Sequence, residues 1–218
     1  MKTALIFGSS GLIGSHLLNV ILQNNEYNKI KLFVRSEQKN NNSKVEIVQT
    51  DFTNLEKYKD LIVGDDCFFC IGTTKKNTPD KNEYRRIEYS IPLSVAQIAK
   101  FNSVKSFIYV SSLGANSSSS GSYLKNKGQV EEELNNLDFS KLAIIRPSIL
   151  LGKRKEHRLG ESIGVYVMQK LSPFFLGKLK KYKPIQAQYV AKAMVAIAQN
   201  NYQKKIFESD QLEMLGKF

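Results

Sequence analysis

Short apolar runs alternate with longer amphipathic segments along most of the chain. Each apolar run is rich in β-branched or aromatic residues, which is typical of a buried strand, and the segments between them show apolar residues at helical spacing. A last short run around Phe207 indicates a terminal strand. The pattern predicts strands at residues 4–7, 31–34, 45–49, 67–71, 106–110 and 142–145, and helices at residues 14–24, 55–61, 84–101, 122–136 and 188–200.

This alternation predicts an α/β fold, in which a doubly wound parallel sheet is covered by helices on both faces. A chain of 218 residues can bury a substantial core as one domain, 1–218, and no linker or repeat divides the sequence. The polar stretch 114–121, just past a strand end, predicts a flexible loop. Residues 146–186 have mixed patterning, so we expect a small C-terminal region there to form the substrate side of a site.

A glycine-spaced turn follows the first predicted strand, at Gly8, Gly11 and Gly14. Gly8 would let the chain turn sharply, because glycine adopts positive φ at no steric cost. Gly11 would leave room for phosphates, and Gly14 would let the next helix lie close to the strand. The free N–H groups at the start of that helix would bind a pyrophosphate, which is typical of a Rossmann-like, NAD(P)-binding fold. The predicted cradle also includes Ser9, Ser10, Leu12 and Ile13.

The end of the second strand indicates which dinucleotide is bound. Sites that prefer NAD carry an Asp or Glu about 20 residues beyond the glycines, where it accepts a hydrogen bond from the ribose 2′-hydroxyl. This chain has Arg35 there instead. Its guanidinium could pair with a 2′-phosphate, assisted by Ser36 and Lys39. We therefore predict NADP (NADPH) as the cofactor, the alternative being an ordinary surface arginine.

Two further strand ends are expected to contact the nucleotide, because ligands of open α/β sheets bind beyond the carboxyl ends of the strands. Asp51 and Phe52 follow the third strand, where a carboxylate could accept a hydrogen bond from the adenine amino group. The alternative for Asp51 is an N-terminal helix cap. Ile71, Gly72 and Thr73 follow the fourth strand, where a small residue would let the backbone approach the adenosine ribose.

Tyr123 and Lys127 are the candidate catalytic pair. They stand at positions i and i+4 of a predicted helix, so both side chains would point into one cleft. A tyrosine with a pKa of about 10 is a poor general base at neutral pH, but a nearby ammonium lowers that pKa. The preceding strand ends in Ser111 and Ser112, whose hydroxyls would project into the same cleft. Ser112 would polarise a substrate carbonyl, Tyr123 would exchange the proton, and Lys127 would tune the tyrosine and hold the nicotinamide ribose.

The net charge of +12 raises the alternative of a nucleic-acid or anionic-membrane surface. Basic residues concentrate at 153–158 and 178–183, and no recognition-helix, zinc-finger or RNA-binding signature accompanies them. We therefore interpret these runs as solvated surface and expect no nucleic-acid partner. A steep loss of nucleic-acid affinity with added salt would favour the alternative.

The only cysteines, Cys67 and Cys70, superficially match a redox or metal motif. Positions i and i+3 of a strand point to opposite faces, so this pair could neither close a disulfide easily nor share one metal ion. With only His16 and His157 as histidines, we expect no metal site. Two cysteines also fit a reducing compartment.

Two further features bear on the compartment. No stretch approaches the roughly twenty apolar residues that a membrane span needs, so we expect no membrane span. The first residues lead directly into the first predicted strand, without the pattern of a signal peptide. We therefore expect a cytoplasmic location.

Taken together, the glycine motif, Asp51, Ser112, Tyr123 and Lys127 resemble the short-chain dehydrogenase/reductase superfamily in type and order, over nearly the whole chain. Within that superfamily the chain resembles the atypical branch that includes the Tat-interacting-protein-like oxidoreductases. The local resemblances lie at residues 70–74, 110–115, 123–131, 145–150 and 215–217. The resemblance implies a Rossmann-like domain that binds NADP(H).

The resemblance also implies that Arg146 and Pro147 line the nicotinamide end of the site. Many relatives carry an asparagine on the helix before the serine strand, where it completes a catalytic tetrad, but this chain has Glu88 at that position. The loop between Ser112 and Tyr123 is short. Atypical members include proteins that bind the cofactor without turnover, so the three catalytic residues alone do not establish catalysis.

Two functional hypotheses follow. The first is an NADP(H)-dependent oxidoreductase that reduces a small carbonyl compound through a Ser-Tyr-Lys site. The alternative is an NADP(H)-binding regulatory or sensor protein, which Glu88 and the short loop favour. The sequence leaves the substrate and the oligomeric state open.

Overall fold

The computed structural model describes residues 1–38, 40–152 and 175–217. The strands of its main sheet are β1 (Lys2–Phe7), β2 (Tyr27–Val34), β3 (Val45–Gln49), β4 (Asp66–Phe69), β5 (Ser106–Val110), β6 (Lys141–Arg146) and β9 (Ile206–Glu208). All seven are parallel, in the order β3-β2-β1-β4-β5-β6-β9. The chain moves outward from β1 in one direction and then from β4 in the other, so β1 and β4 flank the switch point at which such sheets bind ligands.

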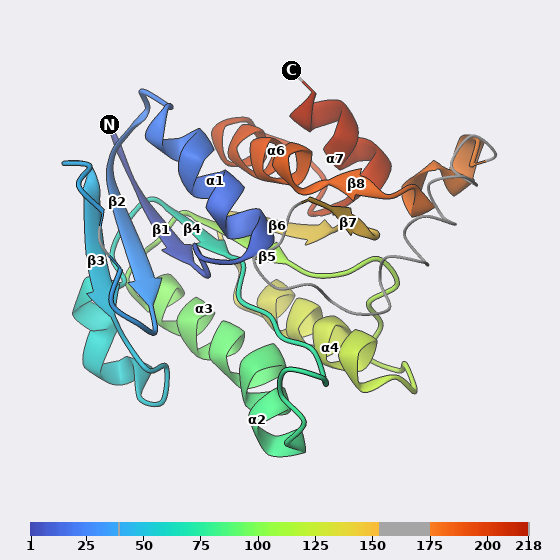
Figure 1. The fold of residues 1–218 in the computed structure, drawn as a ribbon, viewed down its shortest axis with the longest axis horizontal. Helices are drawn as coiled ribbons and strands as arrows, with labels where there is room; N and C mark the ends of the chain where they lie inside the picture. Colours follow the sequence, from blue (N-terminus) through green and yellow to red (C-terminus); the bar gives the residue numbers. More distant parts are fainter. Residues whose placement is uncertain (39, 153–174, 218) are drawn as a thin grey trace.

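Helices cover both faces of this sheet, as Figure 1 shows. One layer contains α1 (Leu12–Leu22), α6 (Ala187–Gln199) and α7 (Ser209–Gly216). The opposite layer contains a 3-10 helix, η1 (Leu55–Leu61), and the helices α2 (Lys81–Arg85), α3 (Ile91–Phe101) and α4 (Ser122–Asn136). This arrangement confirms the predicted α/β fold with a doubly wound parallel sheet.

The core lies in two layers, one on each face of the sheet. In β1, Ala4 and Ile6 pack under α1 and α6, while Leu5 and Phe7 pack toward α3 and α4. The ring of Phe7 stacks on that of Phe33 in β2, with centroids 4.3 Å apart. Because both faces are covered, the strands are apolar at nearly every position, and the sequence pattern is a continuous run rather than an alternation.

Three predicted helices differ from those observed. The helix expected at 14–24 begins earlier, at Leu12, because the glycine turn continues directly into it. The segment 55–61 is a 3-10 helix rather than an α-helix. The helix expected at 84–101 begins at Lys81, because the side chain of Asp80 caps it by accepting from the N–H of Glu83 over 2.7 Å. Its middle, η2 (Arg86–Ser90), is a π-helical turn between α2 and α3.

The C-terminal part completes the sheet and adds a smaller one. The strand expected around Phe207 is β9, and α7 after it is an element that the sequence did not predict. Two short strands, β7 (Leu150–Leu151) and β8 (Ile185–Gln186), form a separate two-stranded parallel sheet. A 3-10 helix, η4 (Gly177–Tyr182), precedes β8 in the chain. Much of the predicted substrate region, together with the basic run 153–158, lies outside the described residues.

Candidate functional site

The turn between β1 and α1 has a backbone path that excludes larger residues. Gly8 has a φ of 88°, a conformation that L-residues rarely adopt. A Cβ on Gly8 would lie 2.9 Å from the backbone carbon of Cys70, and a Cβ on Gly14 would lie 2.1 Å from the carbonyl oxygen of Gly8. The two glycines therefore allow the start of α1 to pack directly on the ends of β1 and β4.

The start of α1 offers hydrogen-bond donors beside this turn. Gly11 precedes the helix, and no side chain caps its first N–H groups, which lack acceptors within the helix. The hydroxyl of Ser9 is buried and has no hydrogen-bond partner among the described residues. A buried donor without a partner costs free energy, and an anion at this point would satisfy it. These groups, with Ser10, Leu12 and Ile13 in the same turn, therefore fit a dinucleotide pyrophosphate.

Arg35 and Ser36 follow directly after β2 and are exposed, while Lys39 lies outside the described residues. Arg35 stands near an ion pair at the start of the opposite helix layer. There, hydrogen bonds from Arg86 lower the pKa of the Glu83 carboxyl, and the charge of Arg35 adds to the effect. Two cations, Arg35 and Arg86, and one carboxylate, Glu83, are therefore close enough to interact at this end of the sheet.

Asp51 holds the loop after β3 in a turn. Its carboxylate accepts from the N–H of Thr53 over 2.9 Å and from the Thr53 hydroxyl over 2.8 Å, and these bonds lower the pKa of Asp51. The residue that flanks η1 is Asn54, so Asp51 stabilises a turn and is not the cap of that helix. Phe52 has a φ of 60°, and its carbonyl accepts from Arg86 over 2.9 Å.

Ile71, Gly72 and Thr73 leave the end of β4 beside the glycine turn. A Cβ on Gly72 would lie 3.3 Å from Oε1 of Glu88, so the backbone at this point packs against a carboxylate. The N–H of Thr73 donates a hydrogen bond to the same oxygen. The segment predicted to approach the adenosine ribose is therefore attached to Glu88.

Tyr123 and Lys127 lie on one side of α4, as their spacing predicts. The ammonium of Lys127 is 6.0 Å from the centre of the Tyr123 ring. Lys127 is 3% exposed, and its Nζ donates to the carbonyl of Val110, the last residue of β5, over 3.1 Å. Tyr123 is 38% exposed. An exposed phenol next to a buried ammonium is an arrangement that can exchange a proton with a bound molecule.

The buried ammonium is paired with Glu88, which lies in the π turn η2. Oε2 of Glu88 is 3.1 Å from Nζ of Lys127, and neither side chain is accessible beyond a few per cent. Burial lowers the pKa of Lys127, but Tyr109 and Glu88 outweigh burial and hold that pKa well above its ordinary value. The sequence had indicated an unusual residue at position 88 but not that it would pair with Lys127.

Two buried phenols complete this cluster. Burial, with the charge of Glu88 adding to it, raises the pKa of Tyr84 to about 12. Burial also raises the pKa of Tyr109, whose ring centre lies 4.8 Å from the Lys127 ammonium. Neither tyrosine was predicted from the sequence. Tyr109 could have been suspected, because it lies in the strand that leads to Ser112.

The two serines after β5 have different surroundings, so the expectation that both hydroxyls project into one cleft is wrong. Ser111 is buried and donates its hydroxyl hydrogen to Glu131. Ser112 is half-buried, and its hydroxyl lies 3.5 Å from the Leu113 carbonyl. No hydrogen bond joins Ser112 to Tyr123 in the part of the chain that the structure describes. Of the two serines, Ser112 is therefore the one whose hydroxyl has no side-chain partner among the described residues.

Glu131 is a further residue that the sequence did not single out. It accepts from Nε of Arg146 at 3.0 and 3.2 Å and from a second guanidinium nitrogen, so the two side chains form a bidentate pair at the end of β6. Pro147 follows, is buried, and accepts through its carbonyl from the N–H of Leu113 over 2.9 Å. The ends of β5 and β6 are therefore tied together behind Ser112.

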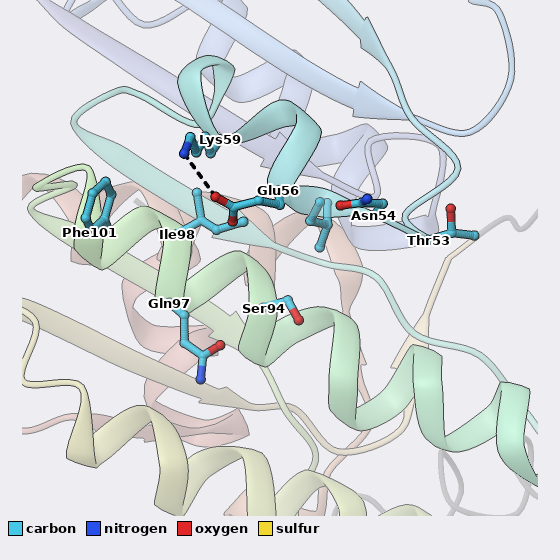
Figure 2. A pocket seen from close by; sticks show the side chains of 9 residues that line it. Thr53, Asn54, Glu56, Lys59, Ser94, Gln97, Ile98 and Phe101 are labelled. Atoms are coloured by element: carbon cyan, nitrogen blue, oxygen red, sulfur yellow. Dashed lines mark ion pairs between the residues drawn. The ribbon is translucent and has the colours of Figure 1, made fainter.

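A groove between η1 and α3 lies apart from this cluster (Figure 2). Ser94, Gln97 and Ile98 line it from α3, and an ion pair between Lys59 and Glu56, 3.1 Å apart, lines it from η1. None of the residues predicted for catalysis or for the cofactor lines this groove. Its two charged groups, Glu56 and Lys59, pair with each other.

The two cysteines lie on opposite faces of the sheet, as their spacing predicts. Cys67 packs in the core layer under α3, and Cys70 packs against the opposite layer, so the two thiols face away from each other. Within residues 1–38, 40–152 and 175–217, no group of histidine, cysteine and acidic residues could hold a metal ion. No helix in those same ranges has the length and apolar character to cross a membrane.

Comparisons with known proteins extend this picture. A family model described as NAD(P)H-binding matches residues 8–201. The chain is 34% identical over 200 residues to the protein FMP52, mitochondrial, of Debaryomyces hansenii, covering 90% of this chain and 87% of that protein. It is 37% identical over 166 residues to the protein HTATIP2 of Rattus norvegicus, covering 73% and 67%. The rat protein confirms the resemblance to the Tat-interacting-protein-like branch.

The cytoplasmic location expected from the sequence is contradicted by these relatives. The similar proteins of Debaryomyces hansenii, Candida albicans and Scheffersomyces stipitis are all named as mitochondrial. The expectation rested on the lack of an apolar stretch long enough to span a membrane and of a signal-peptide pattern, and neither property separates the cytoplasm from the mitochondrion.

Solved structures share the fold. The Bordetella bronchiseptica enzyme WbmH, in complex with NAD+, matches with a TM-score of 0.71 at 17% identity, covering 100% of this chain and 80% of that chain. The likeness at such low identity concerns the arrangement of the sheet and helices. Together with the family model over most of the chain and the glycine turn at the switch point, these findings show that this chain belongs to the NAD(P)H-binding family with a Rossmann-like fold.

Proposed function

We propose that this protein is an NADP(H)-dependent oxidoreductase, of the short-chain dehydrogenase type, that reduces a small carbonyl compound. The observation that carries the proposal is the exposed phenol of Tyr123 beside the buried, charge-paired ammonium of Lys127. A proton donor at the carboxyl edge of a dinucleotide-binding sheet is what carbonyl reduction requires.

The cofactor would lie along the carboxyl ends of the strands. Residues 8–13 would bind the pyrophosphate, Asp51 and Phe52 the adenine, and residues 71–73 the adenosine ribose. Arg35 supports NADP rather than NAD, since it is an exposed cation at the tip of β2 where an NAD site has an acid. Pro147 would line the nicotinamide end. When bound, NADPH supplies a hydride.

The protein's own residues would handle the carbonyl oxygen. The Ser112 hydroxyl donates a hydrogen bond to this oxygen and orients the carbonyl. Tyr123 transfers its phenolic proton to the oxygen, which becomes the alcohol. Lys127 stays protonated because of its buried pairing, so its charge stabilises the phenolate that Tyr123 leaves behind until a solvent proton replaces the one transferred.

The test uses two tyrosines of nearly equal exposure, 38% for Tyr123 and 39% for Tyr202. Oxidation of NADPH is followed with a panel of small aldehydes and ketones, and NADPH affinity is measured separately by calorimetry. We expect Tyr123→Phe to lower turnover about a hundredfold or more, with NADPH affinity changed only a few-fold. Tyr202→Phe should change neither quantity. Unchanged turnover in Tyr123→Phe would show that the assigned proton transfer is wrong.

A second candidate function is an NADP(H)-binding regulatory protein with little or no catalysis. The observation that favours it is the Glu88–Lys127 ion pair, because the lysine charge already has a partner without any bound molecule. A protein partner whose affinity for this chain changes when NADPH is added, together with no hydride transfer to any carbonyl of the panel, would favour this function. Turnover that depends on Tyr123 would exclude it.

A further inference from the structure

Glu88 is the buried carboxylate of the site, and the proposed reaction gives it no role. It is 1% exposed and lies in the π turn η2, where the helix that begins at Lys81 changes its winding. π turns inside helices are uncommon and occur frequently at functional sites. A buried carboxylate is costly unless it is paired and hydrogen-bonded, so its contacts indicate what holds it there.

The two carboxylate oxygens contact two different parts of the site. Oε1 accepts the N–H of Thr73 and lies where a Cβ on Gly72 would come within 3.3 Å. Oε2 lies 3.1 Å from the Lys127 ammonium. Glu88 therefore bridges the loop after β4 and the lysine on α4.

The lysine is oriented by the same contact. Nζ of Lys127 donates to the Val110 carbonyl, pairs with Glu88 and lies beside the ring of Tyr109. Groups of the protein therefore hold the ammonium in place. An asparagine side chain is shorter and uncharged, so it would not supply both the reach and the charge that this bridge uses.

We propose that Glu88 is a positioning residue that joins the cofactor-facing backbone at Gly72 and Thr73 to the catalytic ammonium of Lys127, so that NADPH binding depends on the charge of this pair. The inference rests on the proposed function, because it assumes that NADPH contacts both the loop and the lysine. Glu88 itself need not touch the cofactor or the substrate.

Titratable groups from several elements face Lys127. These groups are Tyr84 from α2, Glu88 from η2, Tyr109 from β5, Tyr123 from α4 and Cys70 at the end of β4. Glu88 is the only carboxylate among them. The raised pKa values of Tyr84 and Tyr109 keep both phenols uncharged near pH 7, so they offer the ammonium no negative charge there. Removing the Glu88 charge therefore leaves burial as the main influence on the lysine, and burial favours the neutral amine.

The first experiment measures the NADPH dissociation constant against pH in the wild type, Glu88→Gln and Glu133→Gln. Glutamine retains an oxygen for the Thr73 N–H but removes the charge. Glu133 is an exposed carboxylate on the helix that carries Lys127, so its variant controls for net charge. In Glu88→Gln we expect NADPH affinity to fall about tenfold between about pH 7 and pH 9, as the lysine loses its proton. The other two proteins should change less than about twofold.

The second experiment is a double-mutant cycle that does not depend on NADPH. Glu88→Gln leaves a buried ammonium unpaired, so the unfolding equilibrium constant should rise about a hundredfold or more. In the double variant Glu88→Gln, Lys127→Met both charges are gone, and the constant should return to within about tenfold of the wild type.

The outcomes separate the two proposals. If Glu88→Gln binds NADPH with the wild-type pH dependence, or if the stability losses of Glu88→Gln and Lys127→Met simply add, the positioning role of Glu88 is overturned. If the wild type itself does not bind NADPH, the proposed function fails instead, and the stability cycle still tests whether the pair exists.

Discussion

Replacing Gly14 with alanine tests the glycine turn more directly than any substitution around Lys127. The new Cβ would lie 2.1 Å from the Gly8 carbonyl oxygen, whereas ordinary contacts begin near 3.4 Å. The atom in the way belongs to the backbone, so no flexible side chain can move aside. Overpacking of this kind costs about 1–3 kcal/mol, and we expect the upper end. Alanine gains about 1 kcal/mol of helix propensity, which leaves a net loss of about 2 kcal/mol.

Gly11→Ala is the matched variant in the same turn. Its Cβ would lie 3.3 Å from the same oxygen, and the φ of −74° at Gly11 suits alanine. The loss of stability should therefore stay below about 1 kcal/mol. The added methyl group would occupy space assigned to the phosphates, so NADPH affinity should fall about tenfold or more.

Both variants are tested in two separate measurements. Urea unfolding gives the stability, and calorimetric titration of the folded protein gives the NADPH affinity. We expect Gly14→Ala to lower the midpoint of unfolding clearly and Gly11→Ala to lower NADPH affinity with little change in the midpoint. A Gly14→Ala protein as stable as the wild type would refute the close contact between α1 and the end of β1. Wild-type NADPH affinity in Gly11→Ala would refute the placement of the phosphates over this turn.

Three further predictions concern other parts of the site. Arg35→Ser should weaken NADPH binding about tenfold or more and leave NADH binding within about twofold; equal losses in calorimetry would exclude a contact with the 2′-phosphate. Glu131→Gln leaves Arg146 without its buried partner and should lower the unfolding free energy by about 3 kcal/mol in urea; a loss below about 1 kcal/mol would mean that the pair behaves as a surface contact. Burial raises the pKa of Cys70 from 9.0 to about 12, so the folded state keeps this proton longer than the unfolded state, and stability should fall as the pH rises through that range. A disulfide reagent at about pH 8 should accordingly modify the half-buried Cys70 much more slowly in the folded than in the unfolded protein, and equal rates would contradict the raised pKa.

The sheet could be predicted from sequence because its strands are buried on both faces. β5, for example, has the predicted bounds, since an apolar run ends where the chain leaves the core. Elements that form only because of tertiary contacts, such as β7 and β8, have no apolar run that could be recognised in the sequence. β7 and β8 are two residues long, and β8 exists because Ile185 and Gln186 lie beside Leu150 and Leu151. Periodicity over two residues cannot be detected.

Helix type was also beyond the sequence pattern. Apolar spacing in residues 84–101 predicts a helix but does not distinguish α from π winding. The extra residue per turn at Arg86–Ser90 places Glu88 against Lys127, and this contact depends on the position of α4. The acid at position 88 was visible in the sequence. Its partner was visible too, but the pairing required the fold.

The serine prediction shows the same limit at the level of one strand. Ser111 and Ser112 are neighbours, so their side chains point to opposite sides of the extended chain. The pattern alone does not say which of the two faces the substrate. Glu131 could have been identified from the sequence, because it stands four residues after Lys127 on the same predicted helix. Residues at this spacing lie on the same face of a helix. A buried acid on that face requires a cation, and Arg146 at the end of β6 provides it.

The orientation of α4 follows from these pairs. Tyr123, Lys127 and Glu131 succeed one another at steps of four along one side of the helix, and only the tyrosine is exposed. The lysine pairs with Glu88 from η2, and Glu131 pairs with Arg146 from β6, so two different elements fix the rotation of the helix. Turning α4 about its axis would break both ion pairs and leave Lys127 and Glu131 buried without partners. Each broken pair would cost about 3–5 kcal/mol. The exposed position of the phenol at the end of the sheet is thus a consequence of two buried ion pairs behind it.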